Sequence, residues 1–60
     1  MKNTDIRISA IENGVRIWEI ARQLGISPET MSRRLRKELS LEEKRRVKNA
    51  ILQAKANKTN

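Results

Sequence analysis

Cysteine and histidine are both absent from this chain of 60 residues. Without thiolates or imidazoles no disulfide can form, and nearly every transition-metal or structural zinc site is excluded. The absence also removes the commonest nucleophiles and proton-transfer groups of enzymes, and Ser27 and Ser40 stand where helix caps are expected. We therefore expect no enzyme, no metal site and no cofactor.

Long apolar runs are missing as well, since none exceeds three residues. A membrane-spanning helix needs about 20 predominantly apolar residues, and a signal peptide needs an apolar core, so we expect neither. A chain free of cysteine is consistent with the cytoplasm. A chain of this length is expected to form one small domain of low stability. The sequence therefore predicts a small cytoplasmic protein.

Acidic residues are scarce in the second half of the chain. The net charge is +7, and residues 27–60 hold ten basic against four acidic side chains, whereas residues 1–26 hold four against three. A concentrated positive charge indicates a polyanionic partner. The alternative is a solvated surface that keeps a small domain soluble.

Capping residues and apolar spacing predict four helices. The expected helices run from Thr4 to Asn13, from Arg16 to Leu24, from Pro28 to about Lys37, and from Ser40 onward. Thr4 is the expected N-cap of the first, the second has no good capping residue at its start, and Ser40 and Glu43 have the spacing of a capping box at the start of the last. No segment alternates for long enough to form a strand, so no wing is expected. The predicted fold is all-α: a compact four-helix domain with a helix-turn-helix over residues 1–54, followed by a disordered basic tail over residues 55–60.

The centre of the chain carries the strongest pattern. Ala21 and Gly25 are four residues apart, and apolar residues surround them at helical spacing. A small residue lets a second helix cross closely, and glycine accepts the positive φ of a tight turn. Ser27 and Pro28 then form a strong helix start. The second helix is expected to project outward, as a helix that enters the major groove does.

The outward face of this second helix supplies the predicted DNA-binding residues. If Met31 and Leu35 face the core, residues at other angles around the helix face outward. Base edges are expected to be read by Pro28, Glu29, Ser32 and Arg33. Phosphates are expected to be contacted by Arg16, Ser27, Thr30, Arg34, Arg36 and Lys37. The alternative for the arginines is an ordinary solvated face.

Two features remain open at this point. Trp18 is the only aromatic residue, and its main interpretation is a core anchor. The alternatives are that it covers the junction with the first helix, contacts the DNA backbone or forms a dimer contact. The last helix has a narrow stripe from Val47 to Ala54 that either closes the core or forms a dimer seam.

The pattern AxxxGISxxTMSRRL over residues 21–35 resembles the helix-turn-helix of bacterial repressors of the Cro and phage-repressor group. Ser32 and Arg33 followed by Leu35 are also similar to the recognition helix of LacI-type repressors. Residues 3–52 as a whole resemble small single-domain helix-turn-helix proteins of Gram-positive prophages and conjugative elements. One departure is Ile17, which stands where phage repressors commonly place a polar residue that grips a phosphate.

The residues and the resemblance together predict sequence-specific binding of double-stranded DNA by a small regulator or repressor from a mobile element. One short helix discriminates weakly, so a homodimer on two half-sites or a partner protein is expected to supply further specificity. No small-molecule ligand and no membrane partner is expected. The alternatives are an excisionase-like or architectural accessory protein and an antirepressor-type module that binds another protein.

Overall fold

The computed structural model describes residues 2–58 and is made of four helices. They are α1 (Thr4–Glu12), α2 (Ile17–Leu24), α3 (Pro28–Arg34) and α4 (Leu41–Lys58). No strand occurs within these residues, so the predicted all-α, four-helix fold without a wing is confirmed.

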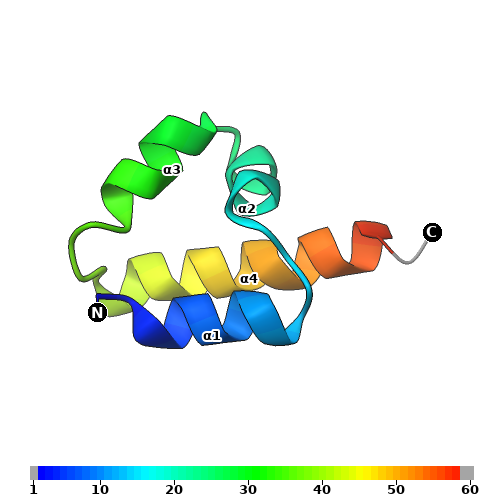
Figure 1. Ribbon diagram of the computed structural model, residues 1–60, viewed down its shortest axis with the longest axis horizontal. Helices are drawn as coiled ribbons and strands as arrows, with labels where there is room; N and C mark the ends of the chain where they lie inside the picture. Colours follow the sequence, from blue (N-terminus) through cyan, green and yellow to red (C-terminus); the bar gives the residue numbers. More distant parts are fainter. Residues whose placement is uncertain (1, 59–60) are drawn as a thin grey trace.

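The helices are arranged around the long helix α4 (Figure 1). Helix α1 lies beside α4 and runs in the same direction, and α2 packs against both α4 and α3. Helix α3 lies on the side of the molecule opposite α1. Because α3 packs mainly on α2, most of its surface is left to solvent.

The predicted start signals of the last two helices act as expected. Ser27 caps α3, and its hydroxyl accepts a hydrogen bond from the main-chain N–H of Thr30 at 3.2 Å. Ser40 and Glu43 form the predicted capping box of α4: Glu43 N–H donates to the Ser40 hydroxyl, and Ser40 N–H donates to the Glu43 carboxylate, both at 3.2 Å. The sequence offered no cap for α2, but the Glu19 carboxylate accepts from Arg16 N–H at 2.8 Å.

One predicted cap and two predicted ends are wrong. Asn3, not Thr4, is the N-cap of α1, and it adopts a left-handed φ of 59°. Helix α3 ends at Arg34, not at about Lys37, because the chain turns away there. Helix α4 continues to Lys58, so residues 55–58 are helical rather than a disordered tail, while residues 59–60 lie outside the described part of the chain. The extension is held by Lys58, whose ammonium pairs with Glu19 at 3.0 Å and donates to the carbonyl of Gly14.

One apolar core joins all four helices. The predicted inward stripe of α4 is buried, so it closes the core and is not left free as a dimer seam. Trp18 is 50% exposed, so the prediction that Trp18 anchors the core is wrong. The buried core consists of Ile6, Ala10, Val15, Ile20, Ala21, Met31, Leu35, Leu39, Val47, Ala50, Ile51 and Ala54.

Candidate nucleic-acid interface

The turn between α2 and α3 has the geometry that the sequence predicted. Ala21 is fully buried, and the N–H of Ile26 donates to the Ala21 carbonyl at 3.0 Å across the turn. Gly25 has a φ of 72°, which closes a Schellman-type helix end. A Cβ at Gly25 would have no atom within 4 Å, so glycine is required there by its φ and not by space. This turn fixes the direction in which α3 leaves α2.

Helix α3 turns one side to the core and the other to solvent. Met31 is 1% exposed and Leu35 is 2% exposed, so both anchor the helix as predicted. The four residues predicted to read bases are all exposed and lie together around one shallow surface hollow, named here the α3 depression. It is lined by Pro28, Glu29, Ser32, Arg33 and Arg36.

The residues predicted to contact phosphates do not form one group. Arg36 belongs to the α3 depression, whereas Arg34 lines a separate groove between α3 and α4 together with Arg46. Lys37 is exposed just beyond α3. Helix α3 itself ends at Arg34, but residues 35–37 continue as tight turns, with Arg36 N–H donating to Arg33 O at 3.2 Å and Lys37 N–H to Arg34 O at 3.3 Å.

The remaining three predicted phosphate residues have local partners or lie elsewhere. The hydroxyls of Ser27 and Thr30 are 2.8 Å apart and are hydrogen-bonded to each other. Arg16 is exposed but lines a different hollow, beside Ile8 and Ile11 of α1. The structure therefore does not bring Arg16 together with the exposed cations of α3.

Ion pairing divides the basic residues into two sets. Four of the six basic residues on α4 form ion pairs with acidic residues. Lys44 pairs with Asp5 at 3.2 Å and with Glu38, and Lys48 pairs with Asp5 at 3.8 Å. Arg46 pairs with Glu42 at 3.7 Å, and Lys58 pairs with Glu19 at 3.0 Å. In contrast, Arg33, Arg34, Arg36 and Lys37 form no ion pair within residues 2–58. Residues 33–37 therefore hold four cations that no acidic residue of the described chain neutralises, more than any other stretch of that length.

Glu29 and Arg33 are one helical turn apart on the exposed side of α3. They form no ion pair within the described chain, although their spacing allows one. The guanidinium of Arg33 is consequently free to meet a ligand without breaking an intramolecular bond.

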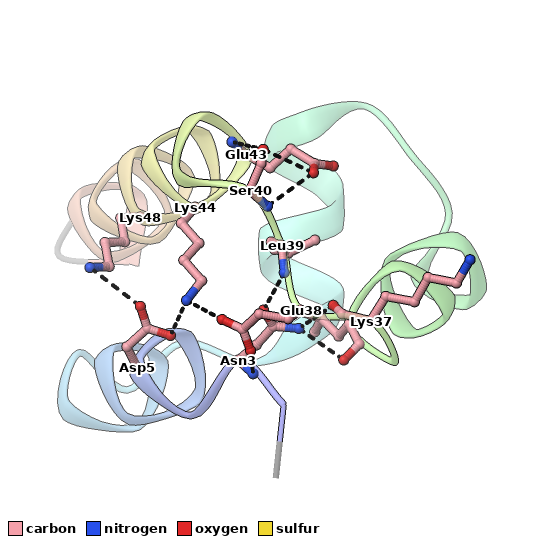
Figure 2. Close-up of polar contacts among 10 residues, drawn as sticks. Asn3, Asp5, Lys37, Glu38, Leu39, Ser40, Glu43, Lys44 and Lys48 are labelled. Atoms are coloured by element: carbon pink, nitrogen blue, oxygen red, sulfur yellow. Dashed lines mark hydrogen bonds and ion pairs between the residues drawn. The ribbon is translucent and has the colours of Figure 1, made fainter.

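The acid–base cluster behind α3 holds the chain that leaves this helix (Figure 2). Lys44 donates to Glu38, which lowers the pKa of Glu38 and raises that of Lys44 from their ordinary values. Asn3 N–H adds a second hydrogen bond to Glu38 at 2.9 Å, which also lowers its pKa. Burial is the largest single influence on the pKa of Asp5 and raises it. The hydrogen bonds from Lys44 and from the main chain of Ile6, together with the nearby charges of Lys44 and Lys48, outweigh burial, so the net shift is downward.

Asn3 is the residue that sequence reasoning missed. It is fully buried, and its side-chain amide donates to the carbonyls of Leu35 at 2.9 Å and Lys37 at 2.8 Å, while its oxygen accepts from Leu39 N–H at 2.9 Å (Figure 2). One side chain thus satisfies three main-chain groups of the segment after α3. The available signal was an asparagine just before a helix, where a left-handed conformation is tolerated, but nothing local identified its distant partners.

No helix within residues 2–58 is both long and apolar enough to cross a membrane. The same residues contain no group of three or more acidic side chains that could hold a metal ion. Comparison of the chain with known protein families, characterised proteins and solved structures finds no match.

Proposed function

We propose that the protein binds double-stranded DNA by placing α3 in the major groove. The observation that carries this proposal is that the basic residues on and just after α3 are exposed and form no ion pair within residues 2–58. In contrast, acidic residues neutralise most of the basic residues on α4. A polyanion would meet these cations without first breaking ion pairs of the fold.

The dimensions of α3 agree with this role. An α-helix with its side chains is about 10–12 Å across, which matches a major groove about 12 Å wide. Arg33 is exposed in the last turn of α3, where its planar guanidinium can donate two hydrogen bonds to O6 and N7 of guanine. Glu29 and Ser32 line the same depression and can accept from a cytosine amine or bond either a base or a phosphate.

Residues near the end of α3 are proposed to hold the backbone. Arg36 and Lys37 carry full charges on flexible stems and bind phosphates without reading sequence. Asn3 and Glu38 do not contact DNA in this scheme. They fix the main chain of residues 35–39, and so set where Arg36 and Lys37 stand relative to α3.

The role proposed for this binding is transcriptional regulation through occupancy of a promoter, which the resemblance to small repressors of mobile elements supports. A pulldown of genome fragments, followed by sequencing, identifies the bound site and its neighbouring genes. Recovery of promoter sites supports regulation. Recovery of clustered sites beside an attachment sequence, with bent DNA, would instead assign an excisionase-like accessory role.

Binding itself is tested by fluorescence anisotropy on a recovered duplex. A double variant Arg33→Ala and Arg36→Ala should lose most of the affinity, because it removes two unpaired cations from the α3 depression. The matched control is Lys55→Ala, which removes an exposed cation from α4 that forms no ion pair within residues 2–58. Equal affinities for the double variant and the control would refute the assignment of α3 as the DNA-binding helix.

A further inference from the structure

Helix α1 carries apolar side chains on two opposite sides. Ile6 and Ala10 face the core and are buried, whereas Ile8 is 49% exposed and Ile11 is 77% exposed. A helix that is apolar on both sides is normally covered on both sides. Within the described chain the second side of α1 has no covering element, so its apolar residues remain open to solvent.

These residues form the edge of a shallow hollow, named here the α1 depression. Its walls come from α1 and from the connection to α2, and its lining is mainly apolar. It includes Arg7, Ile8, Ile11, Val15, Arg16 and Ile17. The apolar residues are clustered, unlike a scatter of single exposed side chains, and such clusters mark interaction surfaces.

The depression also contains a polar group that lacks a partner. Arg7 Nε is buried and has no hydrogen-bond acceptor within the described structure. Arg7 also forms no ion pair within residues 2–58, so the charge of its guanidinium is left for an acceptor from outside the fold. A carboxylate is the strongest acceptor that a protein can offer to it.

The same helix carries such a carboxylate. Glu12 is the last residue of α1, is exposed, and forms no ion pair within residues 2–58. A negative charge at a helix C-terminus is unfavourable, and the last turn of α1 has no basic residue to offset it. A cation beside Glu12 is therefore favourable, as is an anion beside Arg7.

We propose that the α1 depression is the surface through which two copies of this chain associate. A two-fold interface must be self-complementary, which requires both charges and an apolar centre on one patch. Helix α1 meets this condition, with Ile8 and Ile11 between the basic Arg7 and the acidic Glu12. The isoleucines of the two copies pack together, and the guanidinium of each copy meets the carboxylate of the other.

This assignment does not compete with the proposed DNA contact. Helix α1 and helix α3 lie on opposite sides of the molecule, so an interface at α1 leaves α3 exposed in both copies (Figure 1). The inference stands on the geometry of α1 and does not depend on DNA binding.

The test is sedimentation velocity of the full chain without DNA, from micromolar to submillimolar concentrations. A dimer is expected. Ile11→Glu should weaken it by about tenfold or more, since each isoleucine buried in an interface contributes at least that factor. The matched control is Leu52→Glu, because Leu52 is 58% exposed on α4 outside the depression and its substitution should leave the dimer unchanged.

Charge exchange provides the sharper readout. Glu12→Arg alone should weaken the dimer, and Arg7→Glu combined with Glu12→Arg should restore it, because the pair is then reversed in both copies. Circular dichroism shows whether each variant remains folded. A wild-type chain that stays monomeric throughout, a dimer that ignores Ile11→Glu, or capture of a different protein at this surface while the chain itself stays monomeric would overturn the proposal. Loss of DNA binding would leave these sedimentation results unchanged, so the two proposals fail separately.

Discussion

Replacing Asn3 with alanine is expected to lower the free energy of unfolding by roughly 3–5 kcal/mol. The change removes three hydrogen bonds between the buried amide and the main chain of residues 35, 37 and 39. Each contributes about 1 kcal/mol net, and the buried N–H of Leu39 is left without its acceptor, which adds to the loss. Alanine at a φ of 59° costs about 1 kcal/mol more.

This loss is large for so small a domain. A chain of this length has a total stability of roughly 3–9 kcal/mol, so the Asn3→Ala variant should be close to unfolding at room temperature. Urea denaturation followed by circular dichroism measures the difference directly. The segment after α3 should also lose its protection from amide hydrogen exchange, because its carbonyl and N–H partners on Asn3 are gone.

Two further substitutions at the same position separate the causes. Asn3→Gly tolerates the left-handed φ and should be more stable than Asn3→Ala by about 1 kcal/mol. Asn3→Asp keeps the acceptor for Leu39 N–H but cannot donate to the carbonyls of Leu35 and Lys37, so it should retain only part of the stability. An Asn3→Ala variant that loses less than about 1 kcal/mol would refute the role assigned to this side chain.

Three further predictions concern the acid dependence of stability, the turn at Gly25 and the sequence specificity of DNA binding. The pKa of Glu38 lies below its ordinary value of 4.5, chiefly because Lys44 donates to it, so its contribution is complete above that pH and is lost as pH falls through the lowered pKa. Glu38→Gln should therefore flatten the acid dependence of the urea midpoint, and an unchanged slope would contradict this. Gly25→Ala should cost about 1–2 kcal/mol in urea denaturation because its φ is 72°, whereas no loss would mean that the turn accepts another conformation. In anisotropy titrations, Arg33→Ala should reduce discrimination between specific and random duplexes by about 1–3 kcal/mol, while Lys37→Ala should weaken both alike; equal patterns would mean that their roles are wrongly assigned.

Local signals predicted most of the fold. Ser40 and Glu43 lie three residues apart in the sequence, so each side chain can reach the main-chain N–H of the other, and their capping box followed from spacing alone. Ala21 and Gly25 predicted the turn in the same way. The positive φ at Gly25 and the close helix crossing at Ala21 depend on two residues only four positions apart. The inward positions of Met31 and Leu35 followed from helical periodicity.

What the sequence did not reveal depends on long-range contacts. Asn3 bonds to residues more than 30 positions away, and no local pattern states that separation. Helix α4 extends through residues 55–58 because Lys58 contacts Glu19 and the Gly14 carbonyl. The polar sequence of these residues does not predict such long-range contacts. Trp18 was expected in the core because tryptophan usually is, but neighbouring Ile20 and Ala21 occupy the buried side of α2.

The sequence predicted which residues make up the candidate site, but it did not predict which basic residues form ion pairs. Helical angles place Arg33 and Glu29 outward, and the structure confirms that both are exposed. Ion pairing depends on the packing of α1 against α4, because this packing brings Asp5 to Lys44 and Lys48. The distinction between paired and unpaired cations therefore required the three-dimensional structure.

The most direct test of DNA binding by unpaired cations is the salt dependence of affinity for a specific duplex. If about five phosphates are neutralised, the logarithm of the association constant should fall with the logarithm of salt concentration at a slope of about −4 to −5. Removing one phosphate-binding cation by Lys37→Ala should reduce the magnitude of that slope by about 1. An affinity that does not change with salt would contradict the account.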